Sequence, residues 1–237
     1  KGVPIRFIEN KPNFRTLLLG TPWLGSYRIP HVLSGKDSII KQLDLIDFAH
    51  NKRTLINMFS KFPGLLDLLP IHDSRDFGSI KVWDDFVTAA GLETETIPPA
   101  LLNIFSNKKK KMKDNIDSID YSNIVYVAGK DKETVNDYKI KNGRLQFYST
   151  AEGDQSVTWA SGIPAKIDRN KSLYYTNATH GGLSKKEFLF QGILDILKTG
   201  STASHEFSRL PLPVSDGERS FESKEKFEFE TSESGIE

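Results

Sequence analysis

Two short apolar runs, each followed by glycine, limit most strongly what this chain can fold into. The leucines at 17–19 precede Gly20, and residues 124–128 (Ile-Val-Tyr-Val-Ala) precede Gly129. An apolar run without polar alternation is typical of a strand that is covered on both faces, as in a parallel sheet. The sequence therefore predicts an α/β fold with buried strands at 14–19 and 123–128. The loop after each strand then lies at the carboxyl edge of the sheet, where catalytic groups collect.

The chain between these strands has a helical periodicity. Apolar residues recur three and four positions apart from residue 29 to about residue 69. This spacing places them on one face of a helix. Further helices are predicted over residues 80–90 and 99–113, and no strand pattern interrupts them. We call residues 27–115 the helical block.

The part of the chain after the helical block alternates between strands and turns. The dipeptide Asn142-Gly143 lies between β-rich segments at 134–140 and 144–149. Asn-Gly between two such segments is typical of a hairpin with a type I′ turn. A further strand is predicted at 172–177.

The C-terminal part is predicted to begin with a helix and to end as a charged tail. Ser184 has the spacing of an N-cap for a helix over 185–197, with Glu187 as its capping-box partner. Gly200 is expected to end this helix. Residues 201–237 become polar and charged and are predicted to be a tail or linker, although Phe221 could support a short strand.

The composition excludes several classes of function. The 32 basic and 31 acidic side chains leave a formal charge of +1, too small for the broad positive field of nonspecific nucleic-acid binding. No apolar run reaches the roughly 18 residues of a transmembrane helix. The absence of cysteine excludes disulfides and thiolate zinc sites and fits a reducing compartment, so a cytoplasmic location is expected. No cofactor or metal is expected, because no phosphate-binding glycine loop occurs and no metal-ligand spacing is found among four histidines: His31, His50, His72 and His205.

Two loops carry side chains that can act together in catalysis. Asp154 lies in the loop 153–157, and His180 lies in the loop 177–183, which opens a predicted helix. Both loops follow predicted strands, so the acid and the histidine can meet in space. In a serine hydrolase the carboxylate accepts the Nδ1 proton of the imidazole, and Nε2 takes the proton of the nucleophile. The sequence therefore predicts Asp154 and His180 as the acid and the base of such a site.

Three segments resemble motifs of α/β-hydrolase lipases and esterases. Residues 18–26 resemble the LGTPxxGS segment that follows the nucleophile elbow in this family, although Trp23 stands where the family commonly has histidine. Residues 153–157 resemble the GDxxV motif around the acid, and residues 179–183 resemble the HxxL motif around the histidine. The FPGLL segment that begins at Phe62 resembles the cap of lecithin-acyltransferase-like lipases.

The resemblance, which covers roughly residues 14–200, implies the C-terminal half of an α/β-hydrolase sheet with an inserted helical cap. It also implies that Asp154 is the triad acid and His180 the general base, since the family order is serine, acid, histidine. The implied division of the chain is hydrolase core at 1–26 and 116–200, cap at 27–115, and tail at 201–237.

The nucleophile expected from this resemblance has no counterpart in the sequence. No G-x-S-x-G occurs, so the serine and the oxyanion-hole amides are expected upstream, in the other half of the same domain. The expected function is then hydrolysis of carboxylic esters of lipid-like substrates by a Ser-Asp-His triad. The alternative is a catalytically degenerate hydrolase-like domain that serves as a scaffold or binding module in a larger multidomain protein.

Three other features have competing interpretations. Asp131 follows the 123–128 strand and is a rival for the acid, because some hydrolases place the carboxylate there. Ser26 lies in a Gly-Ser pair and is interpreted as a turn or helix-cap residue rather than a nucleophile. The lysines at 108–111, with Lys113, fit either a phosphate or acidic headgroup or, more simply, a solvated helix end.

Overall fold

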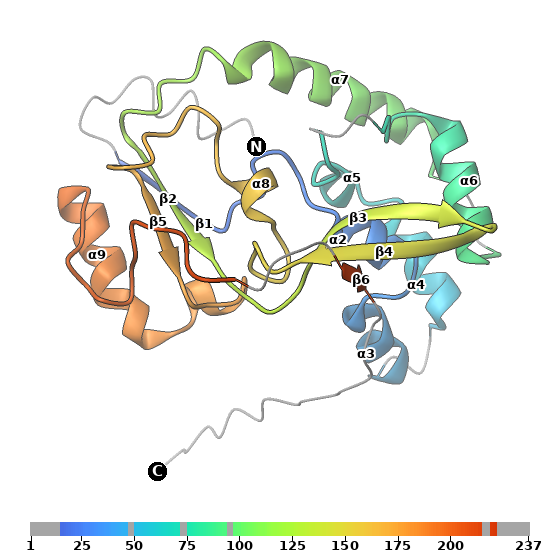
Figure 1. The fold of residues 1–237 in the computed structure, drawn as a ribbon. Helices are drawn as coiled ribbons and strands as arrows, with labels where there is room; N and C mark the ends of the chain where they lie inside the picture. Colours follow the sequence, from blue (N-terminus) through green and yellow to red (C-terminus); the bar gives the residue numbers. More distant parts are fainter. Residues whose placement is uncertain (1–14, 47–49, 72–74, 94–96, 215–218, 222–237) are drawn as a thin grey trace.

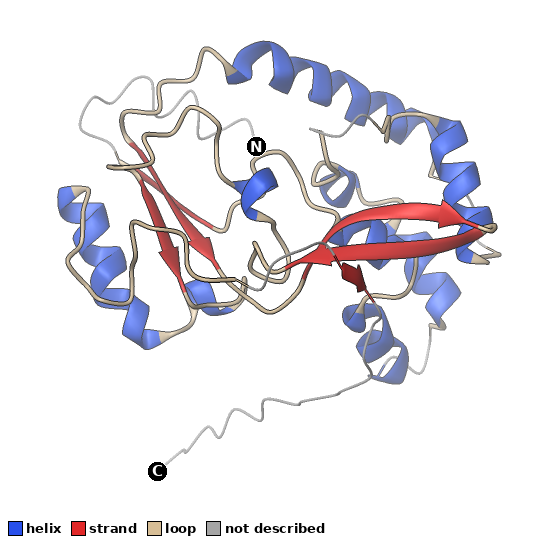
Figure 2. Cartoon of the chain, viewed as in Figure 1, coloured by secondary structure: helices blue, strands red, loops and turns tan. Residues whose placement is uncertain are grey.

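A computed structural model describes residues 15–46, 50–71, 75–93, 97–214 and 219–221 (Figure 1). The fold is of the mixed α/β class, with a three-stranded parallel sheet and a three-stranded antiparallel sheet (Figure 2). The elements in chain order are β1 (Thr16–Leu19), α2 (Arg28–Leu33), α3 (Ser38–Ile46), α4 (Lys52–Phe59), α5 (Pro63–Leu66), α6 (Ile80–Ala90), α7 (Pro99–Ile116), β2 (Ile124–Gly129), β3 (Thr134–Lys141), β4 (Arg144–Thr150), α8 (Trp159–Gly162), β5 (Leu173–Thr176), the 3-10 turns η1 (Gly182–Ser184) and η2 (Glu187–Leu189), α9 (Phe190–Thr199) and β6 (Arg219–Phe221). His72 and the tail beyond residue 221 lie outside the described residues.

The parallel sheet has the order β1-β2-β5, and both pairings are parallel, as the apolar runs predicted. The central strand β2 is buried along its whole length. Its side chains alternate between two hydrophobic clusters, so that Tyr126 packs with Trp159 on one face and Val127 packs with Ile196 on the other. Helix α9 lies beside this sheet in Figure 1. Because both pairings are parallel, the carboxyl ends of the three strands share one edge of the sheet.

Strand β1 differs from the prediction in its burial. The sequence predicted a covered strand, but Leu17, Leu18 and Leu19 are only partly buried. The reason is its place in the sheet, since the described residues pair β1 only with β2 and leave its other edge unpaired. An apolar run indicates that a strand can be buried, but it does not indicate whether another strand pairs with each of its two edges.

The helical block contains α2 to α7 and no strand within its described residues, as predicted. Trp83 is almost fully buried, and its indole N–H donates to the Phe77 carbonyl oxygen at 2.9 Å. The β3–β4 hairpin packs into the same hydrophobic core through Tyr138 and Phe147. The implied division assigned this hairpin to the second core segment, whereas its apolar face is covered by the helical block. None of the helices in the described ranges is both long and apolar enough to span a membrane.

The hairpin turn has the predicted geometry. Asn142 and Gly143 have φ angles of 51° and 70°, the pair of positive values that a type I′ turn requires. This confirms the turn prediction.

The predicted helix cap at Ser184 is wrong. Helix α9 begins at Phe190, and the chain before it forms η1 and η2, separated by an extended residue, Lys186. Both Leu183 and Leu189 are buried against the parallel sheet. In one continuous helix these residues, six positions apart, would lie about 120° apart around the axis. Two short 3-10 turns allow both to face the sheet, and the helix ends at Gly200 with a φ of 87°, as predicted.

The expected tail is partly folded onto the core. Phe207 is buried, with its ring centroid 6.0 Å from that of Tyr174, and Ser208 pairs with Tyr175 in an antiparallel bridge. Strand β6 then pairs with β4. Isolated apolar residues, rather than a periodic pattern, produce these contacts, so the prediction of a linker from residue 201 is wrong for the described residues 201–214 and 219–221.

Candidate active site

The two candidate side chains meet at the carboxyl edge of the parallel sheet. His180 Nδ1 lies 2.9 Å from Asp154 Oδ2, although the residues are 26 positions apart. The His180 amide also donates to the Asp154 carbonyl oxygen at 2.7 Å, so backbone and side chain hold the pair together. The Asp154 side chain is 2% exposed and the His180 side chain is 38% exposed. The carboxylate is therefore buried behind an imidazole that reaches the surface.

The acid loop, residues 151–158, folds back from β4 onto the end of β2. The Trp159 indole donates to the Gly129 carbonyl oxygen at 2.7 Å, and the Asp131 amide donates to the Gly153 carbonyl oxygen at 2.6 Å. These contacts tie the acid loop to the last residue of β2 and to the segment just after it. The hairpin thus separates the acid from the parallel sheet in sequence but not in space.

Backbone amides fix the orientation of the Asp154 carboxylate. Its Oδ1 accepts hydrogen bonds from the amides of Ser156 at 3.0 Å and Val157 at 2.7 Å, which leaves Oδ2 facing His180. The Tyr126 hydroxyl donates to the Thr21 carbonyl oxygen. Burial, with a smaller contribution from the negative charge of Asp154, raises the pKa of Tyr126 well above its usual value. The Asp154 carboxylate itself has hydrogen-bond partners on both oxygens, namely two backbone amides at Oδ1 and His180 at Oδ2.

Gly20, the residue after β1, lies directly against the Asp154–His180 pair, at a position where only glycine fits. Gly20 has a φ of +54°. A Cβ built there would overlap Asp154 Oδ2 and would lie 2.7 Å from Leu183 Cδ1 and 3.1 Å from His180 Nδ1. Gly20 of the LGTP segment thus allows the end of β1 to lie close to Asp154 and His180.

Substitution Gly20→Ala is expected to lower the free energy of unfolding by about 2–4 kcal/mol, through strain at positive φ and through overlap with the pair. Gly91→Ala is a matched control, because Gly91 has a φ of +65° and open space around its Cβ position. Urea denaturation of both variants separates the two contributions, and only the strain is expected at Gly91. Equal losses for the two variants would show that contact with the pair has no cost.

The rival acid and the serine considered in the sequence occupy other places. The acid that bonds His180 is Asp154 and not Asp131, whose amide instead supports the acid loop. Ser26 accepts a hydrogen bond from the Arg28 amide at 3.0 Å, which confirms its turn role, and it donates to the Ser156 carbonyl oxygen. No hydrogen bond joins Ser26 to His180.

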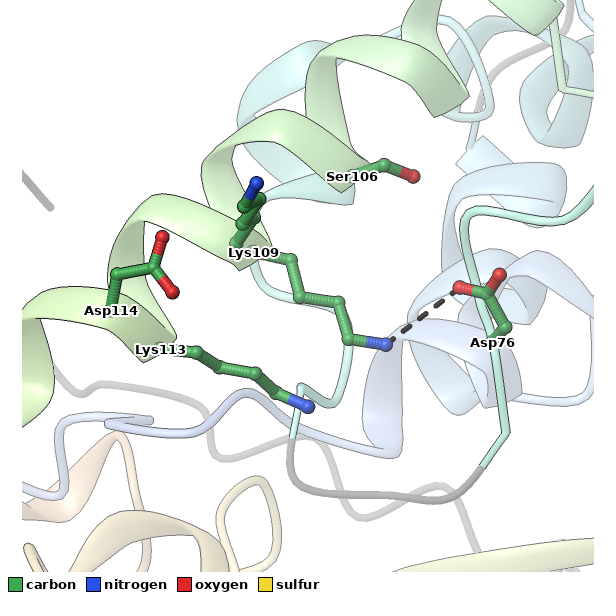
Figure 3. A pocket seen from close by; sticks show the side chains of 6 residues that line it. Asp76, Ser106, Lys109, Lys113 and Asp114 are labelled. Carbon is green, nitrogen blue, oxygen red and sulfur yellow. Dashed lines mark ion pairs between the residues drawn. The ribbon is translucent and has the colours of Figure 1, made fainter.

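The lysine run lies on α7, where acidic side chains pair with part of it. Lys108 pairs with Asp67 at 2.6 Å and Lys109 with Asp76 at 3.7 Å. A surface pocket beside the run is lined by lysines and by acids, as Figure 3 shows for Lys109, Lys113, Asp76 and Asp114. Its lining includes neither Asp154 nor His180. Because its charges are mixed, this surface gives no specific support to the anion-binding interpretation.

A second His-Asp contact, which the sequence did not suggest, lies within the helical block, between α2 and the residue that precedes α3. His31 Nδ1 lies 3.4 Å from Asp37 Oδ2, and Arg28 Nε donates to the same oxygen at 3.1 Å. Burial alone would raise the pKa of Asp37, but the His31 hydrogen bond and the Arg28 charge outweigh it and hold that pKa well below its usual range. Arg28 also contacts Ser156, 128 positions away. Contacts over such separations have no local sequence signal.

Protein-family models, curated proteins and solved structures were compared with this chain, and none of them matches. The family resemblance therefore rests on the motifs alone, and function must be inferred from the geometry of the Asp154–His180 pair.

Proposed function

We propose that this chain is the acid-and-histidine part of an α/β-hydrolase of the lipase and esterase type, which cleaves carboxylic esters of lipid-like substrates. The observation that carries the proposal is the hydrogen bond between His180 Nδ1 and Asp154 Oδ2 at the end of a parallel sheet. A carboxylate at Nδ1 favours the tautomer in which Nε2 is free to accept a proton. This is the arrangement that a serine nucleophile needs.

The pair would act twice in each catalytic cycle. In acylation, His180 Nε2 takes the proton of the serine hydroxyl as the oxygen attacks the ester carbonyl, and then gives it to the departing alkoxide. In deacylation, the same nitrogen takes a proton from the water that attacks the acyl-enzyme and then gives it to the serine oxygen as the carboxylic acid departs. Asp154 stabilises the imidazolium formed in each step. The buried carboxylate and the exposed ring suit these two roles.

Two further observations support placing the serine in an upstream half of the same domain. Nε2 of His180 makes no hydrogen bond to any residue in the described ranges. The edge of β1 that no strand of the described residues pairs with, together with its partly buried leucines, is a surface that another strand would cover. A strand that pairs with β1 in parallel would end at the same sheet edge as the Asp154–His180 pair, which is where a nucleophile elbow belongs.

Labelling of the full-length protein with an alkyl fluorophosphonate tests the proposal, because such probes react with a serine activated by histidine. Peptide mapping by mass spectrometry is expected to find one modified serine, upstream of Lys1, in native but not in heat-denatured protein. Native protein that takes up no label would overturn the hydrolase proposal and favour the scaffold alternative. A label on a serine within the present sequence would overturn the upstream placement.

A further inference from the structure

We infer that Arg28 and Ser26 are positioning residues, which hold the acid loop in the conformation that the Asp154–His180 pair requires. This inference rests on the proposed function. It connects the turn before α2 and the first residue of α2 with the catalytic acid, although neither Ser26 nor Arg28 is hydrogen-bonded to the Asp154–His180 pair.

Ser156, the residue at the centre of this connection, is held from two sides. Ser26 Oγ donates to its carbonyl oxygen, and Arg28 Nη1 donates to its Oγ at 2.6 Å. The Ser156 amide in turn donates to Asp154 Oδ1 at 3.0 Å. One residue therefore links the helical block to the catalytic carboxylate, and a shift of Ser156 would move a donor on which the carboxylate depends.

The acid loop needs such support because its backbone is strained. Gln155, between Asp154 and Ser156, has a φ of +83°, which is uncommon for a residue other than glycine. A conformation of this kind persists only where surrounding contacts hold it. On one side Thr134 Oγ1 accepts from the Gln155 amide at 2.9 Å, and on the other side stand Ser26 and Arg28.

Arg28 is itself anchored in the helical block. Its Nε donates to Asp37 Oδ2 at 3.1 Å, and Asp37 Oδ1 accepts from the Ile39 amide at 2.9 Å in α3. The Asp37 side chain is buried, so the charge of Arg28 is held in one place. The guanidinium thus spans from α3 to the acid loop and uses separate nitrogens for the two contacts. A movement of the first helices of the block would reach Asp154 through it.

The experiment compares four variants of the full-length protein in steady-state hydrolysis of a soluble p-nitrophenyl ester. Arg28→Met removes both guanidinium contacts and keeps an unbranched side chain similar to the aliphatic stem of arginine, whereas Arg28→Lys can keep only one of the two contacts. Ser26→Ala removes the contact to the Ser156 carbonyl oxygen. Arg75→Met is the matched control, because Arg75 is a half-buried arginine with a 3.1 Å ion pair to Asp137 and no hydrogen bond to the acid loop.

Arg28→Met is expected to lower kcat about 10- to 100-fold while KM changes little, because misplacement of a catalytic group slows chemistry more than binding. Arg28→Lys and Ser26→Ala are expected to give smaller losses, and Arg75→Met to leave kcat unchanged. Hydrogen exchange gives a second readout, in which the Ser156 and Val157 amides lose protection in Arg28→Met but not in Arg75→Met. If Arg28→Met does not fold, Ser26→Ala and Arg28→Lys carry the same test.

The outcomes distinguish this inference from the function on which it rests. Unchanged kcat and amide protection in the Arg28 and Ser26 variants, beside an inactive His180→Ala, would overturn the positioning role and leave the hydrolase intact. Equal losses in Arg28→Met and Arg75→Met would also overturn it, since they would indicate a general loss of packing. Full activity of His180→Ala would overturn the proposed function instead.

Discussion

Replacement of His180 by alanine in the full-length protein is expected to abolish ester hydrolysis, with kcat lower by about 10⁶-fold, the loss seen when the base of a serine triad is removed. The physical reason is that no other described side chain is bonded to the Asp154 carboxylate as a base. The serine would then have to attack as a neutral hydroxyl. The remaining rate would come from binding and from the oxyanion hole.

The measurement is kcat for a soluble ester, together with thermal denaturation followed by circular dichroism. His205→Ala is a suitable control, because the His205 side chain is 91% exposed and pairs only with the neighbouring Glu206 among the described residues. That variant is expected to keep the activity of the wild type. Activity of His180→Ala within about tenfold of the wild type would refute the assignment of the base.

Substitution Asp154→Asn is expected to lower kcat by about 10⁴-fold, as the corresponding change does in serine proteases. An asparagine can offer its NH₂ group to Nδ1, which favours the tautomer that carries the proton on Nε2. The neutral amide also fails to stabilise the imidazolium. The fold should survive, because asparagine has the size of aspartate and its oxygen can still accept from the Ser156 and Val157 amides.

Asp131→Asn is the matched control for this substitution, since Asp131 was the rival acid in the sequence. Its carboxylate is not the partner of His180, so kcat should stay within about threefold of the wild type. A larger loss in Asp131→Asn than in Asp154→Asn would reverse the assignment of the acid. Circular dichroism of both variants excludes unfolding as the cause.

Local patterns predicted the elements whose causes are local. The apolar runs gave the parallel pairing of β1 with β2, and the Asn142-Gly143 turn followed from its requirement for two positive φ angles. Helix α6 begins at Ile80 and ends at Ala90, where the periodicity placed it. The meeting of Asp154 and His180 was also predicted, although the route differs: the His180 loop follows β5 of the parallel sheet, whereas the acid loop follows β4 of the antiparallel sheet and folds back onto the end of β2.

The features that the sequence did not predict depend on distant neighbours. Ser184 has the spacing of a cap, but the burial of both Leu183 and Leu189 requires a break in the helix. The exposure of β1 depends on whether a strand lies at its other edge, and the folding of the residues around Phe207 depends on contact with the Tyr174 ring of β5. The contact of Arg28 with Ser156 spans 128 positions and has no local signature.

The most direct test of the Asp154–His180 pair is a measurement of the His180 tautomer by nuclear magnetic resonance on protein labelled with ¹⁵N-histidine. The signals are assigned by comparison with His180→Gln. The neutral imidazole is expected to carry its proton on Nδ1, with Nε2 bare, and this preference should disappear in Asp154→Ala. A proton on Nε2 in the wild type, or a tautomer that is unchanged in Asp154→Ala, would contradict the pairing on which the proposed hydrolase mechanism depends.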